Sequence, residues 1–583
     1  MKLSRWRISR KSGAIVAAVL LLVQAGLLAW TAWRNSPVTD EPGQLSAGIS
    51  HWELGRFELY RVTPPLVRSV GAVAALLAGP TTDWSAFHAG PGTRADHAVG
   101  RDFAEVNGPR IFWLTTVARW ACIPFALLGG AICFRWAREL YGEASGLLAL
   151  ALWCFSPDVL GHGHLLTTDV AGASFSVATF YSFWRWLRGR TWADAILAGC
   201  FLGGALLTKA TYVIDFGLML ILWLVWRLRQ KSSRSAAGFG WDIGQIAAIF
   251  AVALFLVNAA YGFDGSFKRL KDYIFVSEAL AGHGVDHSVG GNRFSKSWPG
   301  VIPVPLPEQY VLGVDYQKIY FERGLRSYLR GEWKTGGWWY YYLYGLAVKV
   351  PLGTWLLVFL GAATTAWGLT RGKFVDDLLL LAPALAVLVL VSSQTGFNKN
   401  LRYVMAVYPF AFVWVSRVVS EDVLRAGRGV VPAALVAAGW SVASSLSVYP
   451  HSLSYFNEAV GGPERGHEHL IHTNIDFGQD LLYLRDWLQE HPTPGPLFVT
   501  YYGKVDPRSA GIKYSLPMRD DGRWPPGRYA ISVNILRGHG WTVPDGNGAR
   551  VAIHDDYSSF LTRKPVGRAG YSIYIYDVAG GEG

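Results

Sequence analysis

The chain has 583 residues, of which 51% are hydrophobic and only 16% are charged, and its mean hydropathy is +0.22. This balance excludes an ordinary soluble globular protein and indicates a protein embedded in a membrane. The four cysteines all lie in apolar segments and predict no disulfide framework. The net charge of +12 predicts no nucleic-acid partner, because the Lys and Arg residues follow the ends of apolar segments.

The first apolar segment, residues 14–33, follows a basic start. Its length of about 20 residues suits a bilayer span better than the shorter core of a signal peptide. We therefore predict a retained first helix within a polytopic α-helical membrane protein of about 11 transmembrane helices. The later spans are predicted at about 111–134, 144–155, 170–186, 192–207, 212–226, 243–261, 351–369, 378–391, 403–415 and 430–448.

Residues 1–461 form the predicted transmembrane domain, with a first outer loop at 34–110 and a long outer loop at 262–340. The first outer loop carries two short amphipathic stretches, one through Leu45 and Ile49 and one that begins at Pro65, which predict helices lying in the membrane interface. Residues 462–583 have a mixed composition and predict a small extracytoplasmic α/β domain. Its expected elements are a helix at 480–489 and strands at 497–502, 529–535 and 571–578.

The distribution of Lys and Arg orients the predicted spans. Alternate connections hold the excess of basic residues, which marks the cytoplasmic side. This pattern predicts a cytoplasmic N-terminus, with the two outer loops, residues 157–169, residues 392–402 and the C-terminal domain on the opposite side. The residues assigned to the cytoplasmic side are Arg5, Arg7, Arg10, Lys11, Arg135, Arg138, Arg185, Arg188, Arg190, Arg227, Arg229, Lys231, Arg234, Arg371, Lys373, Arg417, Arg425 and Arg428.

Asp40 and Glu41 directly follow the first predicted span. Carboxylates at a membrane surface are costly to leave unpaired, so they indicate a cation, a hydrogen-bond donor or a substrate nearby. The alternative is a solvated helix start whose dipole favours the two charges. Asp169 begins another span at the same predicted face, where a capping role is again the alternative. Two carboxylate sites brought together by helix packing can divide general-base and substrate-orienting roles.

His162 and His164 lie in the loop before Asp169. Their spacing invites a zinc site, but a third ligand at helical spacing is lacking and the signal is weak. We therefore predict no metal at these histidines and assign them to substrate binding.

Three cations, Lys209, Lys349 and Arg402, stand at outer ends of predicted helices. Each one alone is explained by a side chain that extends to the interface. A Lys nearer the centre of a membrane helix costs about 2.5 to 3.5 kcal/mol to insert. Three cations at the carboxylate face favour an anionic partner such as a phosphate.

The segment YPHSLSYFNEAVGGPERGHEHLIHTNIDFGQDL, residues 449–481, is the most specific part of the sequence. Its polar density exceeds what a helix cap needs. We assign four of its side chains to substrate binding: Asn474, Asp476, Gln479 and Asp480.

Five blocks of the sequence carry a family resemblance. They are TDEPGQLSAGISHWELGRF at 39–57, SPDVLGHGHLLTTD at 156–169, GGALLTKAT at 203–211, GEWKTGGWWYYYLYGLAVKVP at 331–351, and SYFNEAVGGP through NIDFGQDL at 454–481. The chain resembles the membrane-embedded C-type glycosyltransferases, in particular bacterial members of the protein O-mannosyltransferase and aminoarabinose-transferase superfamily. The part after about residue 496 has no counterpart in the resemblance.

The resemblance implies a C-type glycosyltransferase fold in the bacterial inner membrane, with an extracytoplasmic active site. It implies a polyprenyl-phosphate-linked sugar as donor and an inverting transfer to a hydroxyl of an unknown acceptor, which is a protein, a glycolipid or an envelope polymer. Asp40 matches the general base, with Glu41 beside it, and Asp169 matches the second acid. Lys209 and Arg402 match residues near the donor phosphate, and we add Lys349 by its position.

Two departures qualify the resemblance. Phe477 stands where related sequences have Trp, which puts aromatic stacking at that position in question. Asp169 is a single acid rather than an acidic pair, so we predict no obligatory cofactor and leave a divalent cation, Mg²⁺ or Mn²⁺, as an open alternative. The rival function is a transporter or flippase of lipid-linked sugars, which uses the same cations without bond cleavage. The lack of paired halves in the sequence disfavours that rival.

Overall fold

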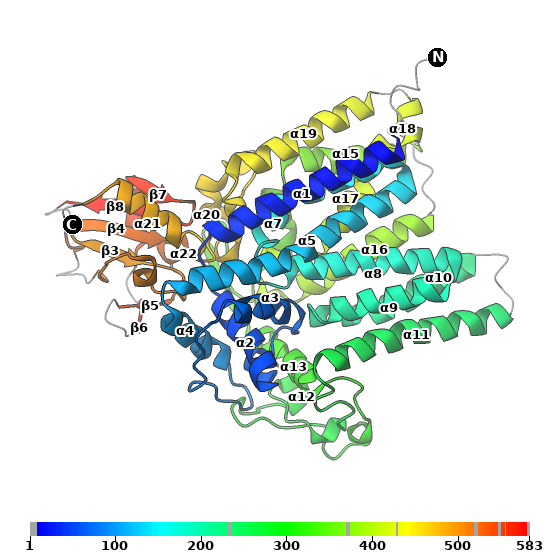
Figure 1. The fold of residues 1–583 in the computed structure, drawn as a ribbon, viewed down its shortest axis with the longest axis horizontal. Coiled ribbons are helices and arrows are strands. Elements are labelled where there is room, and N and C mark those ends of the chain that lie inside the picture. Colours follow the sequence, from blue (N-terminus) through cyan, green and yellow to red (C-terminus); the bar gives the residue numbers. More distant parts are fainter. Residues whose placement is uncertain are drawn as a thin grey trace.

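The computed structural model describes residues 9–229, 236–368, 374–426, 429–493, 495–517, 523–545, 550–553 and 556–579. Long helices run side by side in a bundle, and a small sheet lies beyond one end of it (Figure 1). The helices up to residue 260 are α1 (Arg10–Arg34), α2 (Glu41–Leu54), α3 (Leu66–Leu77), α4 (Ala95–Asn107), α5 (Arg110–Tyr141), α6 (Glu143–Cys154), α7 (Pro157–His162), α8 (Asp169–Gly189), α9 (Trp192–Leu206), α10 (Ile214–Arg229) and α11 (Ala236–Ala260).

The later helices are mostly shorter and are interrupted by two hairpins and a sheet. They are α12 (Glu278–Ala281), α13 (Glu308–Arg323), α14 (Tyr341–Lys349), α15 (Leu352–Ala366), α16 (Phe374–Ser393), α17 (Val407–Val415), α18 (Glu421–Ala426), α19 (Val430–Val448), α20 (Gly466–His469), α21 (Leu481–Glu490) and α22 (Val533–Leu536). The strands are β1 (Arg326–Leu329), β2 (Glu332–Thr335), β3 (Leu497–Thr500), β4 (Gly527–Ser532), β5 (Thr542–Pro544), β6 (Arg550–Ala552), β7 (Gly567–Ala569) and β8 (Ile573–Val578).

The helices support an integral membrane protein, but they do not confirm 11 spans. Within the described residues, 6 helices are long and apolar enough to cross a membrane: α1, α5, α10 with the turn before it, α11, α16 and α19. The pair α14 and α15, bent by 111°, makes a seventh if it forms one span. Each predicted span does fall on a helix, yet α6 and α17 have only 12 and 9 residues. An apolar sequence indicates only that a helix lies in an apolar environment. A short helix buried inside the bundle has such an environment without crossing the membrane.

The two ends of the bundle differ in the way that the basic residues suggest. The start of α1, α18, the end of α10 and the start of α11 lie at one end, whereas α20, α21 and the sheet lie at the other (Figure 1). The side of the membrane that each end faces stays a prediction. Seven of the basic residues used for it, and the predicted end of one span at Leu369, lie outside the described residues; the seven are Arg5, Arg7, Lys231, Arg234, Arg371, Lys373 and Arg428.

The first outer loop folds against the bundle rather than along an interface. Both amphipathic stretches are helical, as α2 and α3, but every residue of α2 from Glu41 to His51 is buried. Gly43 and Gly100 permit this burial, since a Cβ added to Gly100 would lie 2.5 Å from the backbone nitrogen of Gly43. The prediction of an interface-lying helix is therefore wrong for α2, because α3, α4 and α5 surround its apolar face and its polar face alike.

The sheet of the C-terminal segment has the order β3-β4-β8-β7, with β3 parallel to β4 and the other pairs antiparallel. It contains the three predicted strands, as β3, β4 and β8, and α21 is the predicted helix. The second strand ends at Ser532, three residues before the predicted end, because Val533 starts the short helix α22. The domain boundary at 462 stays a prediction, since the segment before α21 is buried against the bundle.

Candidate active site

Asp40, Asp169, Lys209 and Arg402 form one continuous chain of ion pairs. Arg402 Nη2 lies 2.9 Å from Asp40 Oδ2, and Arg402 Nη1 lies 3.3 Å from Asp169 Oδ2. Lys209 Nζ lies 2.6 Å from Asp169 Oδ1. The four residues come from four distant segments, so the fold brings together the residues that the sequence placed at one face.

The two carboxylates of this chain differ in access. The Asp40 side chain is 28% exposed, whereas the Asp169 side chain is 4% exposed. Asp40 is the N-cap residue of α2 but its side chain accepts no capping hydrogen bond, and Thr168 rather than Asp169 is the N-cap of α8. Both carboxylates therefore lie at a helix start, but neither forms a side-chain capping hydrogen bond. Asp40 is thus the more accessible of the two carboxylates.

An aromatic ring, that of Phe477, packs against the guanidinium group of Arg402. The centre of the Phe477 ring lies 4.7 Å from its guanidinium carbon. Planar guanidinium groups pack well on aromatic faces. Phe477 therefore supplies a stacking surface for Arg402.

Glu41 lies in a different setting from its neighbour. Its side chain and that of Arg119 are both 0% exposed, and Arg119 donates to both carboxylate oxygens, from Nε at 2.8 Å and from Nη2 at 2.6 Å. The same carboxylate accepts the backbone N–H of Val38 at 2.8 Å and that of Leu166 at 2.9 Å. These four bonds occupy the acceptor capacity of the carboxylate.

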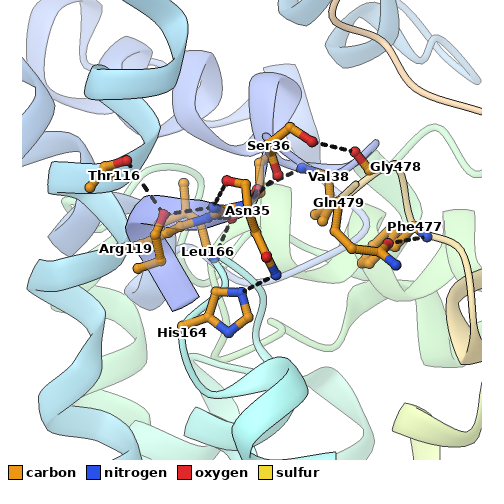
Figure 2. Close-up of polar contacts among 12 residues, drawn as sticks. Asn35, Ser36, Val38, Thr116, Arg119, His164, Leu166, Phe477, Gly478 and Gln479 are labelled. Carbon is orange, nitrogen blue, oxygen red and sulfur yellow. Dashed lines mark hydrogen bonds and ion pairs between the residues drawn. The ribbon is translucent and has the colours of Figure 1, made fainter. Parts of the chain in front are cut away.

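Arg119 also fastens the end of α1. It donates to the backbone carbonyls of Ala32, Asn35 and Ser36 at 3.0, 2.7 and 2.9 Å. In Figure 2 the Arg119 side chain reaches from its helix into the loop that carries Asn35 and Ser36. The pair of Arg119 and Glu41 thus joins α1, α5, the start of α2 and the loop before Asp169.

The loop before Asp40 is paired with the turn at 477–479 (Figure 2). Ser36 N donates to Gln479 O at 3.0 Å, and Thr39 N donates to Phe477 O at 2.9 Å. The Ser36 hydroxyl donates to Gly478 O at 2.8 Å and accepts from the backbone of α21. The backbone position of Asp40 therefore depends on residues more than 430 positions later in the chain.

Asn474 holds the segment that carries Arg402. Its Oδ1 accepts the N–H of Leu401 at 2.8 Å, and its Nδ2 donates to Lys399 O at 2.9 Å. Lys349 is 1% exposed and donates to the carbonyls of Leu453 at 2.8 Å and Asn474 at 2.5 Å. Among the described residues Lys349 forms no ion pair and does not join the chain of ion pairs. Its contacts brace the backbone.

The other polar residues of this segment are also buried and bonded within the protein. Gln479 donates from Nε2 to Ile475 O at 3.0 Å and accepts the N–H of Phe477 at 2.7 Å. Asp480 accepts from the Ser572 hydroxyl at 2.8 Å. Asp476 accepts from Gly478 N at 3.1 Å, while its buried Oδ2 has no partner in the described part of the chain. Burial raises the pKa of Asp476 well above its usual range.

The two histidines of the second outer loop have unequal roles. His164 is 0% exposed, and its ring lies 3.1 Å from Leu160 O and 3.4 Å from Asn35 Nδ2. His162 is buried, and its Nδ1 has no hydrogen-bond partner among the residues described. Burial lowers the pKa of His162 to about 3, so its ring is neutral beside Asp169. His162 Nδ1 is thus a buried polar atom without a partner in the described residues.

A divalent cation does not fit this arrangement. Both oxygens of Asp169 and one oxygen of Asp40 are paired with Lys209 or Arg402, so the two carboxylates do not present an open set of oxygen ligands. The described ranges contain no group of three or more His, Cys, Asp or Glu side chains placed to hold a metal ion.

Three cations near the site were missed in the sequence. Arg119 had a signal, since a charged residue inside an apolar segment is costly and marks a pair or a site. Lys399 stands three residues before Arg402 and is close enough to Asp40 for an electrostatic interaction. Lys504, from the loop after β3, also interacts with Asp40 and had no sequence signal.

Residues 113–261, from α5 through α11, match a protein family described as dolichyl-phosphate-mannose-protein mannosyltransferase. The match confirms the predicted resemblance to the protein O-mannosyltransferase superfamily of membrane-embedded glycosyltransferases. No curated protein sequence matches the chain.

Similar solved structures include ArnT from Cupriavidus metallidurans bound to undecaprenyl phosphate, with 12% identity and a TM-score of 0.44 over 98% of this chain and 99% of that one. The archaeal oligosaccharyltransferase AglB from Archaeoglobus fulgidus, in complex with an inhibitory peptide and a dolichol-phosphate, has 11% identity and a TM-score of 0.38. That comparison covers 94% of this chain and 74% of the AglB chain.

Proposed function

We propose that this chain, whose residues 113–261 match the protein mannosyltransferase family, is a glycosyltransferase that moves a sugar from a polyprenyl-phosphate donor to an acceptor hydroxyl. The observation that carries the proposal is the chain of ion pairs from Asp40 through Arg402 and Asp169 to Lys209. Asp40 is partly exposed and pairs with Arg402, and Asp169 links Arg402 to Lys209. This supports a transfer that needs a base near cations.

In the proposed reaction, Asp40 accepts the proton of the acceptor hydroxyl as its oxygen attacks the anomeric carbon. The bond between that carbon and the phosphate oxygen breaks on the opposite face, and its electron pair stays on the lipid phosphate. The sugar configuration is inverted. Lys209 and Arg402 stabilise the charge that develops on the phosphate, and Asp169 holds both cations in place before the donor arrives.

The donor enters from the bundle side in this proposal. Lys209 follows α9 and precedes α10, at the end of helices that lie in the membrane bundle. A polyprenyl tail stays in the bilayer, so its phosphate reaches the site at that end. The active site then faces the extracytoplasmic side of the bacterial inner membrane, which the basic connections predict.

The remaining predicted site residues divide into two groups in this proposal. His162 contacts substrate through its free ring nitrogen. Glu41, His164, Lys349 and the residues at 474–480 position the reacting groups, because their polar atoms bond to protein groups.

Purified protein with a radiolabelled polyprenyl-phosphate sugar tests the proposal. Asp40→Asn should lower the turnover of acceptor glycosylation about 10²- to 10⁴-fold, the contribution of a general base, and should leave donor binding intact. A variant with near-full turnover would refute the assignment of the base. Movement of the labelled lipid across proteoliposomes, with the sugar–phosphate bond intact, would favour a flippase instead.

A further inference from the structure

Two lysines near Asp40 are not explained by the proposed donor site. The chain of ion pairs is electrically balanced, since two carboxylates pair with two cations. Lys399 interacts electrostatically with Asp40, and Lys504 interacts first with Asp96, which already pairs with Arg94, and then with Asp40. Both lysines add positive charge near Asp40. In the described part of the chain, no carboxylate lies within ion-pair distance of either lysine. A buried cation without a paired anion is costly, so this excess charge calls for a ligand.

Contacts within the protein hold the backbone of Lys399 and the side chain of Lys504. The Lys399 carbonyl accepts from the Tyr341 hydroxyl at 2.7 Å and from Asn474 Nδ2 at 2.9 Å, while its side chain remains half-buried. Lys504 is 9% exposed, and its Nζ lies 2.8 Å from His97 Nδ1 of α4. Burial lowers the pKa of both ammonium groups. Both positions are therefore built before any ligand binds.

A row of half-buried aromatic rings borders the lysines. Trp333 of β2 and His539 are stacked, with ring centres 6.1 Å apart and planes 10° apart. His539 and Trp541 are also stacked, at 6.2 Å and 28°. Burial and then the charge of Lys399 lower the pKa of His539 to about 3, so its ring is neutral. The three rings, called the aromatic row here, join the long outer loop to the C-terminal segment.

An unpartnered imidazole lies against the same row. His472 is 2% exposed, and neither of its ring nitrogens has a hydrogen-bond partner in the described residues. Its ring centre lies 4.4 Å from that of His539 and 5.7 Å from that of Trp333. Its φ of +58° is a conformation that a residue with a side chain rarely adopts. Such strain and such unmet polar groups are typical of functional positions.

We propose that Lys399, Lys504 and the aromatic row form the acceptor site, and that it binds a saccharide carrying an anionic group. The lysines hold the phosphate or carboxylate of that saccharide, the aromatic rings pack against its sugar face, and the acceptor hydroxyl meets Asp40. This inference rests on the proposed glycosyl transfer.

The location separates this acceptor site from the donor site. Lys504 and His539 belong to the segment that contains the sheet, which lies beyond the end of the bundle (Figure 1). Lys209 is linked to Asp40 only through Asp169 and Arg402, and it lies between the ends of α9 and α10. A lipid phosphate reaches Lys209 from the bilayer, whereas the aromatic row is reached from the aqueous side. The flat rings favour a saccharide over a peptide, because sugar faces pack on aromatic planes.

The test measures both binding and transfer with the full-length protein in detergent micelles. The probes are a phosphorylated disaccharide, a hexuronate disaccharide and a neutral disaccharide of the same size. Lys504→Met and Lys399→Met should each raise the Kd of at least one anionic probe about 10- to 100-fold, the effect of losing a charge-assisted hydrogen bond. Lys504→Arg should restore most of the affinity, and binding of the polyprenyl-phosphate donor should stay unchanged. The better of the two anionic probes identifies the anionic group.

Lys513→Met is the matched control, because Lys513 is an exposed lysine of the same segment. It should change no Kd, and the thermal midpoint of unfolding of every variant identifies failures of folding. Equal Kd values for the neutral and anionic probes, or unchanged Kd in both lysine variants, would overturn the inference. The inference would also be overturned if Lys399→Met and Lys504→Met transferred sugar with the wild-type acceptor KM. That result would leave the proposed function intact. Loss of the proposed function would instead appear as normal turnover in Asp40→Asn.

Discussion

Replacing Glu41 by Gln separates structural from catalytic roles in the adjacent acidic pair. The substitution keeps the shape of the side chain but removes the charge that faces Arg119, and both side chains are 0% exposed. Arg119 retains its three backbone carbonyl partners. It nevertheless becomes a buried cation without an anion, and this is the perturbation that the experiment uses.

The expected cost follows from the buried pair. Breaking a buried ion pair by removing one partner typically costs about 3 to 5 kcal/mol. The Gln side chain has one carbonyl oxygen for Val38 N and Leu166 N, which now bond to two different carboxylate oxygens. One of these N–H groups loses its acceptor, at about 1 to 3 kcal/mol. Even the lower total is a large fraction of the 5 to 15 kcal/mol that stabilises a typical domain.

The assay compares thermal unfolding and turnover in the same detergent for Glu41→Gln and Asp40→Asn. Glu41→Gln should lower the Tm clearly, with turnover per folded molecule reduced much less than in Asp40→Asn. Asp40→Asn should show the reverse, because Asp40 is partly exposed and Arg402 retains Asp169. The double variant Glu41→Gln/Arg119→Met should be more stable than the sum of the single losses predicts.

A Glu41→Gln protein with wild-type Tm and abolished turnover would refute this reasoning. Glu41 would then act on the substrate, and the Arg119 contact would be incidental. Strictly additive losses in the double variant would also count against a coupled pair.

Two further substitutions distinguish the remaining cations. Lys209→Met should raise the KM for the polyprenyl-phosphate donor at least 10-fold with little change in Tm, because the lysine contacts Asp169 and is 17% exposed. An unchanged donor KM would exclude Lys209 from the phosphate site. Lys349→Met should instead lower the free energy of unfolding, measured by chemical unfolding, by about 1 to 3 kcal/mol for each of the two carbonyls that lose their donor. A raised donor KM with wild-type stability would instead place Lys349 in the phosphate site.

The sequence predicts which charged residues lie together at the site better than it predicts which partner each of them has. Asp40, Asp169, Lys209 and Arg402 each follow or precede an apolar segment, so topology alone places them at one face. Asp40 and Glu41 are adjacent in sequence, yet only one of them pairs with Arg402. That distinction depends on the helix α2, whose first residue turns inward to Arg119, and no local pattern encodes the partner.

The fold shows the same limit. Apolar periodicity identifies the helices and the strands β3, β4 and β8, because the spacing of buried residues along a helix or a strand is visible in the local sequence. Which helices cross the membrane depends on length and tertiary packing, as the 12-residue helix α6 and the bent pair α14 and α15 show. The roles of Asn474 and Lys349 depend on bonds to backbone groups of distant segments, which composition does not report.

The pairing of residues 36–39 with the turn at 477–479 has a consequence for biosynthesis. A chain made from its N-terminus inserts the Asp40 loop long before its partners Phe477 and Gln479 exist. Asp40, the proposed base, therefore takes the position described here only after residues 477–479 have been synthesised and have folded back onto the first loop. If the proposed function holds, a chain that ends before these residues would be unable to consume lipid-linked sugar, because Asp40 would lack the backbone pairing that positions it.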